Sequence, residues 1–180
     1  YSCGKAAPNM EVRIASADPA NIPGEIQIKG ANVFLGYFKN EEATAEVLTE
    51  DGWFKTGDMG ILDAEGSLFI KGRTKCMILG PSGQNIYPEE VETVVNSQPY
   101  VVDSLVIEDD GGLTALIYPD FQQGEKEGMS QEAMVKYMEG TLAELNTILP
   151  NYARLKKIEV MSEDFERTPK KSIKRYLYQR

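Results

Sequence analysis

The apolar residues of this 180-residue chain change their spacing near residue 75. Before that point they alternate with polar residues, for example over 10–16 and 21–30, between turns marked by proline and glycine. Alternation with period two indicates half-buried strands. Beyond that point, segment 130–149 has apolar residues at intervals of three and four, which is typical of an amphipathic helix. We therefore expect an α+β protein with two parts of different character.

The first part, residues 1–74, is expected to be a β-rich subdomain. It contains a hairpin over 59–73 that bends at 64–66, and a short helix over 40–48 with Asn40 as its N-cap. The second part, residues 75–180, is expected to be a small α+β domain with a central sheet flanked by helices. Its expected elements are a strand, a glycine-rich loop and a helix over 75–97, strands over 100–109 and 112–120, one long helix over 130–149 and a strand over 155–161.

Composition excludes several functional classes. The net charge of −9 argues against a general nucleic-acid-binding protein, which needs a cationic surface. The absence of histidine excludes Ser-His and Cys-His catalysis within this chain. Cys3 and Cys76 have no metal-ligand spacing, so we expect reduced thiols and no metal site. No apolar run approaches the ~20 residues of a membrane span. The chain starts with Tyr rather than Met, and we expect it to be a fragment.

The segment FKTGD ends in Asp58, a candidate for nucleotide binding. A carboxylate can accept hydrogen bonds from both hydroxyl groups of a ribose. A plain turn explains the same residues at least as well. Arg73 follows after one hairpin, so the returning strand can bring it near Asp58. The alternatives for Arg73 are a contact with the nucleotide and a surface salt bridge of little energetic value.

Two further segments are candidates for function. GPSGQNIYPEEVE is a glycine-rich loop that opens a helix, with Pro88 suited to the first turn. It lacks the Lys and Ser/Thr of a phosphate-binding loop and could equally line a substrate channel. Segment 167–180 has six basic residues and no acidic residue. It is either a solvated, partly frayed tail or a cationic element that docks onto an anionic group.

The order and spacing of these segments resemble the adenylate-forming acyl-CoA ligase superfamily, and the bacterial long-chain fatty acid-CoA ligases most. The segments that carry the resemblance are SCGKAAPNMEVRI, GEIQIKG, GWFKTGDMG, IKGRTKCMIL, GQNIYPEEVE and TPKKSIKR. Such enzymes use Mg-ATP to convert a carboxylic acid into an acyl-adenylate and then transfer the acyl group to coenzyme A. The resemblance implies that residues 1–74 are the end of a large AMP-binding domain and 75–180 a mobile C-terminal domain.

The resemblance also implies roles for individual residues. Asp58 binds the ribose of ATP and AMP, Arg73 contacts the ribose or phosphate region, and Lys75 is the hinge. Gly83 and its loop line the pantetheine channel. The family's phosphate loop and its segment for adenine and magnesium lie outside these residues, so the resemblance implies that this piece is inactive alone and that Mg²⁺ is bound mainly elsewhere.

One position departs from the family pattern. Where the family has its catalytic lysine, this chain has Ser172, which cannot supply positive charge to the reacting groups. Lys171 and Lys174 are the candidates to replace that lysine. Two alternatives to a ligase remain open: a non-catalytic relative that binds acyl groups or nucleotides, and an interaction module.

The resemblance further implies the partners and the location. The substrates are a fatty acid, ATP and coenzyme A, and the location is the cytoplasm or the inner face of the membrane, with peripheral membrane contact left open. Neither acyl chain length nor oligomeric state follows from the sequence.

Overall fold

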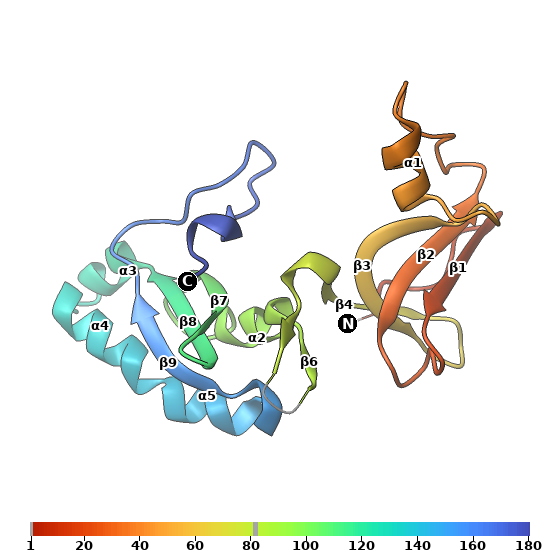
Figure 1. Cartoon of the computed structure of the whole chain (residues 1–180). Coiled ribbons are helices and arrows are strands. Elements are labelled where there is room, and N and C mark those ends of the chain that lie inside the picture. Colours follow the sequence, from red (N-terminus) through yellow and green to blue (C-terminus); the bar gives the residue numbers. More distant parts are fainter. Residues whose placement is uncertain (1, 81–82) are drawn as a thin grey trace. The chain divides into compact units, whose positions relative to one another are not determined.

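The computed structural model describes residues 2–80 and 83–180, and the chain divides into two compact units between Cys76 and Met77 (Figure 1). The first unit contains a four-stranded antiparallel sheet in the order β1-β2-β3-β4. Its strands are β1 (Met10–Ala15), β2 (Gly24–Gly30), β3 (Phe54–Leu62) and β4 (Leu68–Arg73). Helix α1 (Glu41–Val47) begins after Asn40, whose side chain accepts a hydrogen bond from the Ala43 backbone N–H, as predicted.

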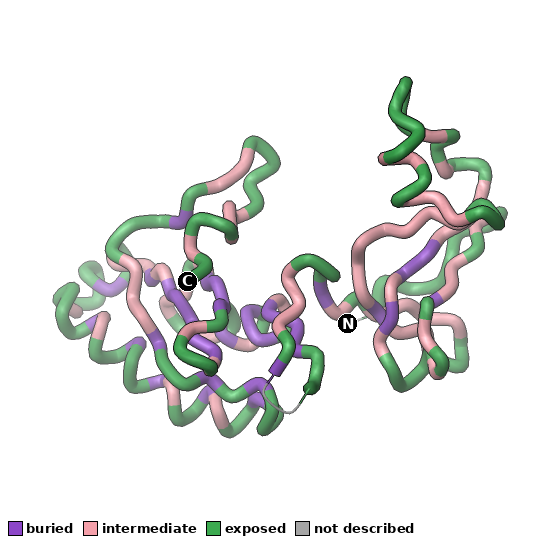
Figure 2. Tube along the Cα trace, viewed as in Figure 1, coloured by how far each residue is buried: buried purple, intermediate pink, exposed green. Residues whose placement is uncertain are grey.

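The sheet of the first unit has little apolar cover. Among its described residues, Ile14 and Ile26 are the only hydrophobic residues that are fully buried, and they lie opposite each other on β1 and β2. Several large apolar side chains of the same unit are exposed, including Leu35 (100%) and Phe38 (89%). Figure 2 shows correspondingly little purple in this unit. An isolated sheet of this kind leaves apolar surface in water.

The second unit is built on a three-stranded sheet in the order β7-β8-β9. Strands β7 (Val101–Asp109) and β8 (Gly112–Pro119) form an antiparallel hairpin, and β9 (Leu155–Val160) pairs parallel to β8. The parallel pairing requires a crossover connection, which contains three helices. These are α3 (Phe121–Lys126), α4 (Gln131–Gly140) and α5 (Leu142–Ile148). A small hairpin of β5 (Ile78–Leu79) and β6 (Asn85–Ile86) precedes helix α2 (Pro88–Val95).

The two faces of this sheet are covered differently. One face packs against helices in a core whose members are Ile86, Val91, Val95, Val106, Leu113, Ala115, Ile117, Met134, Met138, Leu145, Leu149, Ala153, Leu155 and Ile158. The opposite face contributes Leu105, Ile107 and Leu116, which pack with Phe165 and, at the edge, Ile173. Figure 1 shows α4 and α5 on one side of the sheet and the C-terminal segment on the other. Alternating residues of β7 therefore belong to separate cores, as the pleat of a strand requires.

The α+β class and the central sheet are confirmed, and three details differ from the sequence predictions. The single long helix over 130–149 is two helices that meet at Thr141. There the Thr141 hydroxyl and backbone N–H both donate to the Met138 carbonyl, at 2.7 and 3.1 Å, which tightens the turn after Gly140. Helix α3 and strand β6 are not predicted from the sequence. The basic C-terminal segment is not frayed but is docked on its own unit.

Candidate functional site

Asp58 lies in a bulge inside strand β3, and not in a plain turn that ends a strand. Between the pairs Glu25–Met59 and Gln27–Lys55, strand β2 has the single residue Ile26. Over the same interval β3 has three residues, Thr56, Gly57 and Asp58. Bulges re-aim side chains and are frequent beside active sites.

Local hydrogen bonds define the shape of the bulge. The Thr56 hydroxyl donates to the Ile26 carbonyl at 2.8 Å and accepts from the Asp58 N–H at 3.1 Å. The Gly57 N–H donates to Glu25 Oε1 at 3.3 Å. Gly57 has a φ of +74°, a backbone conformation that is unfavourable for residues with a Cβ atom. In the sequence Thr-Gly-Asp, the threonine hydroxyl thus bridges two backbone groups of the bulge and the glycine adopts the left-handed conformation. The aspartate supplies a carboxylate that is partly exposed to solvent.

The structure brings the two predicted nucleotide-binding residues together. Asp58 and Arg73 are directly opposite on β3 and β4, and Arg73 Nε lies 2.9 Å from Asp58 Oδ1. The side chains are 30% and 66% exposed, respectively, so both are accessible to a ligand. Within the described residues no donor is recorded for Asp58 Oδ2, so the carboxylate keeps acceptor capacity for hydroxyl groups.

The predicted hinge and the glycine-rich loop lie near the start of the second unit. Lys75 is exposed in a single 3-10 turn, Thr74–Cys76, beside the division between the units. Gly83 has a φ of +78°, and its N–H donates to the Gly80 carbonyl at 2.9 Å. The rest of the predicted loop, residues 81–82, lies outside the described residues.

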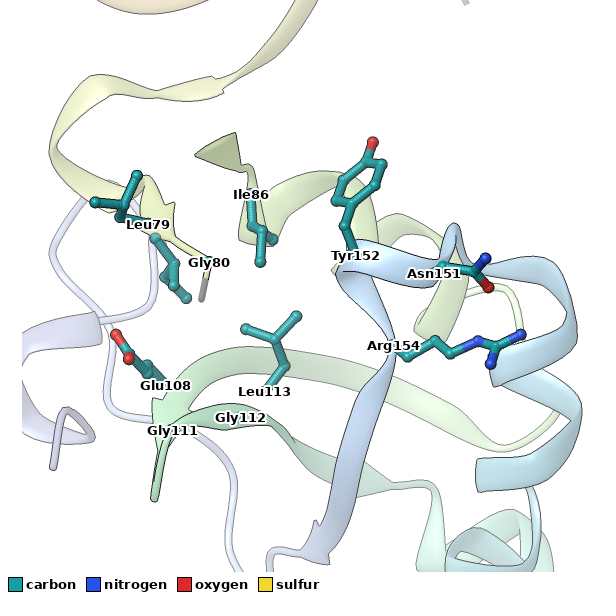
Figure 3. A pocket seen from close by; sticks show the side chains of 11 residues that line it. Leu79, Gly80, Ile86, Glu108, Gly111, Gly112, Leu113, Asn151, Tyr152 and Arg154 are labelled. Carbon is teal, nitrogen blue, oxygen red and sulfur yellow. The ribbon is translucent and has the colours of Figure 1, made fainter. Parts of the chain in front are cut away.

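A cavity of about 310 Å³ lies between the β5–β6 hairpin and the β7–β8 turn. Ile86 and Leu113 point toward each other across it (Figure 3). Its lining consists of Ile78, Leu79, Gly80, Ile86, Glu108, Gly111, Gly112, Leu113, Asn151, Tyr152 and Arg154. The apolar lining with a few polar groups at its edge suits part of an organic ligand. Sequence reasoning did not identify this cavity, because its residues come from four separate segments.

Lys171 and Lys174, the two candidates for the missing catalytic lysine, differ in their surroundings. Residues 167–173 form a hairpin, with an antiparallel bridge between Arg167 and Ile173. Lys171 lies at its turn with a φ of +65°, where its N–H donates to the Thr168 carbonyl at 2.8 Å. This is a three-residue hairpin loop with a left-handed third residue.

The two lysines also differ in whether a carboxylate lies beside the ammonium group. Lys174 Nζ lies 2.9 Å from Glu166 Oε2, and this hydrogen bond raises the pKa of Lys174. Lys171 is exposed, and no ion pair is recorded for it within residues 2–80 and 83–180. Lys171 is therefore the candidate whose charge remains available to a ligand.

Three arginines dock the C-terminal segment onto the second unit. Arg167 contacts Asp103 and Asp164, Arg175 contacts Glu92, and Arg180 contacts Asp109 and Glu159, all at 2.7–3.1 Å. The Asp164 and Asp103 carboxylates raise the pKa of Arg167. Burial raises the pKa of Glu92, whereas the bound guanidinium of Arg175 acts in the opposite direction. The anionic group onto which the basic segment docks is thus the domain itself.

The described part of the chain has neither a cluster of metal-ligating side chains nor a helix that could span a membrane. No group of three or more Cys, Asp or Glu residues there could hold a metal ion. The described side chains therefore do not form a metal site made by protein ligands alone. No described helix is long and apolar enough to cross a membrane.

Comparison with solved structures defines the class of protein. The chain superimposes on O-succinylbenzoate coenzyme A synthetase (MenE) from Bacillus subtilis, in complex with ATP and magnesium ion, with a TM-score of 0.79 and 30% identity. The superposition covers 97% of this chain and 35% of that chain. The fold is that of adenylate-forming enzymes. Residues 77–180 match the family model of the AMP-binding enzyme C-terminal domain, and the chain belongs to this family.

Relatives by sequence are acyl- and aryl-CoA ligases. Long-chain-fatty-acid–CoA ligase FadD15 of Mycobacterium tuberculosis is 31% identical over 192 residues, covering 96% of this chain. 2-Succinylbenzoate–CoA ligase of Bacillus cytotoxicus is 43% identical over 109 residues, covering 59% of this chain. The chain spans 31% and 22% of the lengths of these two relatives. The resemblance to acyl-CoA ligases is thereby confirmed at the level of the family.

Proposed function

We propose that this chain is the C-terminal part of an AMP-forming ligase that activates a long-chain fatty acid and transfers it to coenzyme A. In the first half-reaction a carboxylate oxygen attacks the α-phosphorus of ATP, and the bond to the departing pyrophosphate breaks. In the second, the thiol sulfur of coenzyme A attacks the acyl carbon, loses its proton and expels AMP. The bulge that presents Asp58 beside Arg73 is the observation that carries this proposal.

Asp58 would hold the nucleotide by its ribose. Its Oδ1 is occupied by Arg73 at 2.9 Å, which orients the carboxylate, and its remaining lone pairs can accept from the 2′- and 3′-hydroxyl groups. The exposed guanidinium of Arg73 keeps further N–H groups for ribose or phosphate oxygen atoms. Mg²⁺ would neutralise the phosphates of ATP and would be held by parts of the protein outside this chain.

The proposal also assigns separate roles to the two parts of the chain. Residues 1–74 would complete the large AMP-binding domain, and the exposed Leu35 and Phe38 support this because a larger domain would cover them. Residues 75–180 would be the mobile domain, with Lys75 as its hinge. The Gly83 loop would line the channel for the pantetheine of coenzyme A.

Lys171 is favoured over Lys174 as the replacement for the lysine missing at Ser172. During adenylation, negative charge passes between the carboxylate and the α-phosphate, and a nearby ammonium group stabilises it. Lys174 is engaged by Glu166, whereas Lys171 stands at the exposed turn. The left-handed conformation of Lys171 also breaks the alternation of an extended strand. Its side chain is therefore not forced to the face opposite Ser172.

The proposal extends to the substrate and the location. FadD15 supports a long-chain fatty acid, whereas relatives named for succinylbenzoate show that this family accepts other acids. ATP and coenzyme A are available in the cytoplasm, which we propose as the location, with contact at the inner membrane face for a lipid substrate.

The test is pyrophosphate exchange into ATP by the intact protein, with fatty acids of several lengths and with 2-succinylbenzoate. We expect exchange that depends on a long-chain fatty acid, and a loss of about 100-fold in Lys171→Ala but not in Lys170→Ala. Loss in Lys174→Ala instead would assign the role to Lys174. Exchange with succinylbenzoate alone would refute the fatty acid assignment.

A second candidate function rests on Ser172. A protein that lacks the family lysine could bind acyl groups or nucleotides without turnover. This alternative predicts measurable ATP binding by the intact protein, abolished in Asp58→Ala, together with no exchange for any of the acids. The pyrophosphate-exchange assay therefore distinguishes the ligase from a protein that only binds its ligands.

A further inference from the structure

The hairpin of residues 167–173 cannot hold its own orientation. It has one antiparallel bridge, Arg167–Ile173, and a turn closed by two backbone hydrogen bonds at 2.8 Å. A two-stranded hairpin of this size is marginal in water. The position of its tip, with Lys171, must therefore depend on contacts at its base.

Besides the packing of Ile173 against Phe165, the base has ion pairs, and the pair made by Arg175 is more buried than the one between Arg167 and Asp103. Arg175 lies two residues after the hairpin, and its guanidinium meets Glu92 of helix α2 through two contacts of 2.8 and 3.0 Å. The side chains are 22% and 11% exposed. Arg175 also donates to the Val106 carbonyl of β7 at 3.2 Å, and Glu92 accepts from the Val106 N–H at 2.7 Å. Helix, strand and C-terminal segment thus meet in one closed network.

Arg167 holds the other side of the hairpin to the same strand. Its Nη2 lies 2.9 Å from Asp103 Oδ2 on β7 and 3.0 Å from Asp164 Oδ1. Its Nη1 donates to the Lys171 carbonyl at 3.3 Å, so it also contacts the turn. Arginine side chains in the first strand of the hairpin and just after its second strand therefore attach it to β7.

Stability alone does not account for the Arg175–Glu92 pair. Removing two charges from water costs nearly as much as their attraction returns, and an apolar pair of equal volume often serves stability as well. A two-pronged arginine–carboxylate contact does define one relative orientation. The same helix α2 follows the Gly83 loop after the short strand β6, so the contact links the two functional segments proposed for this unit.

We propose that Arg175 and Glu92 are positioning residues, which orient the Lys171 hairpin for adenylate formation. This inference rests on the proposed function, because it takes Lys171 as the group that acts on the carboxylate and α-phosphate. The network places the tip; it does not itself touch the substrate. Arg167 and Asp103 act in the same way from the other strand.

The test uses the intact protein and separates the two half-reactions. The variants are Arg175→Lys, Arg175→Met and the double variant Glu92→Met/Arg175→Met, which leaves no buried charge unpaired. Arg180→Met is the matched control, because Arg180 also docks the segment by ion pairs but lies outside the hairpin and is half exposed. Each is assayed for pyrophosphate exchange, for thioester formation from pre-formed acyl-adenylate, and for melting temperature.

We expect the double variant to keep the parental KM for ATP, while kcat for exchange falls about tenfold or more. Its melting temperature should fall, because the Val106 N–H and carbonyl lose their side-chain partners. Thioester formation from the adenylate should change by less than about twofold. Arg175→Lys should recover only part of the exchange rate, because lysine cannot form the two-pronged contact. Arg180→Met should match the parent in exchange and in thioester formation, although its melting temperature should fall slightly because Arg180 also pairs with Glu159 and Asp109.

Three results would overturn the inference. Unchanged exchange in the double variant would show that the hairpin is oriented without the pair. A parallel fall of melting temperature and both half-reactions would show a structural role only. Absence of exchange in the parent itself would refute the proposed function and this inference together, whereas the first two results leave the proposed function standing.

Discussion

Asp58 and Arg73 face each other across strands β3 and β4, and Arg73 Nε lies 2.9 Å from Asp58 Oδ1. Asp58 reaches this position because three residues of β3 lie opposite the single residue Ile26 of β2. The pair is partly exposed, so as an ion pair it contributes little to stability. Its value lies in presenting an oriented carboxylate at the surface of the sheet.

The first prediction concerns recognition of ribose by Asp58. In the intact protein, Asp58→Ala should lower kcat/KM for ATP about 100-fold, since hydrogen bonds to a charged group contribute about 1.5–3 kcal/mol each. The parent should also discriminate against 2′-deoxy-ATP. Asp58→Ala should use ATP and 2′-deoxy-ATP almost equally, because the group that senses the hydroxyl is gone.

Asp51→Ala is the matched control for this experiment. Asp51 also pairs with an arginine of the same unit, Arg13, at 3.0 Å, but it is an exposed residue outside the bulge segment 56–58. It should leave kcat/KM for both nucleotides unchanged. If Asp58→Ala still discriminates between the two nucleotides as the parent does, Asp58 does not contact the 2′-hydroxyl.

The second prediction compares two glycines of β3. A Cβ on Gly57 would meet no atom within 4 Å, so Gly57→Ala should cost only the strain of its positive φ, about 1 kcal/mol. A Cβ on Gly60 would lie 2.7 Å from the Phe69 carbonyl oxygen and 2.9 Å from Ile26 Cδ1. Gly60→Ala should therefore cost about 2–3 kcal/mol.

Urea unfolding of the intact protein measures both free energies. Gly57→Ala should be the more stable variant but the less active one. Gly57→Ala should raise KM for ATP because it distorts the bulge that holds Asp58, although it is the milder change. Equal stability losses would contradict the close backbone approach at Gly60.

Local sequence patterns explain which parts of the fold were predictable. Strands with period-two alternation, the Asn40 cap and the turn over 109–112 are all visible in the sequence because they depend on near neighbours. The bulge at Thr56–Asp58 was not predictable, since it depends on where the β2 register shifts. The break at Thr141 is equally hidden, because a threonine in a helical pattern gives no sign of the carbonyl it will bind.

The contact between Glu92 and Arg175 was likewise not predictable from the sequence, because it joins distant segments. Glu92 lies on the buried stripe of helix α2, with Val91 and Val95, and a carboxylate there is a signal that a partner must exist. Nothing local identifies that partner as Arg175, which is 83 residues away. The six basic residues of the segment suggested a cationic surface, whereas three of them are arginines paired within the domain.

The third prediction separates charge from backbone conformation at Lys171. Lys171→Gly removes the ammonium group but favours the positive φ of 65° at this position. The variant should be more stable than Lys171→Ala by about 1 kcal/mol. Both variants should lose pyrophosphate exchange to the same extent if the charge is what matters. Exchange retained in Lys171→Gly would mean that the hairpin, not the lysine, is required.

The fourth prediction concerns the proposed hinge. Lys75→Pro would fix φ within the 3-10 turn Thr74–Cys76 and hinder rotation of the second unit. Exchange and thioester formation from pre-formed adenylate should then fall to different extents if, as proposed, the second unit rotates about Lys75 between the two half-reactions. Lys75→Ala, which keeps φ adjustable, is the control. Equal effects on both half-reactions in Lys75→Pro would count against a hinge at this residue.

The last prediction is a pH dependence of stability at Glu159. Arg180 and Lys157 lie 2.7 and 2.6 Å from its carboxylate and lower its pKa from 4.5 to about 2, with the Arg180 hydrogen bond as the main cause. A lowered folded-state pKa stabilises the fold above the unfolded-state value, and this stabilisation is lost as pH falls from about 4.5 to about 2. Because the Arg180 side chain is 50% exposed, screening reduces the effect to about 1 kcal/mol.

Glu159→Gln should therefore be about 1 kcal/mol less stable than the parent at neutral pH. The difference should shrink to a small fraction as pH falls from about 4.5 to about 2, because the parent then takes up a proton at Glu159 and loses the charge that glutamine lacks. Urea unfolding of the intact protein between pH 2 and 7, followed by circular dichroism, measures this difference. Glu163→Gln is the control, since Glu163 is an exposed carboxylate with no recorded ion pair among the described residues. A gap between parent and Glu159→Gln that is the same at every pH would show that Glu159 acts through packing and not through its charge.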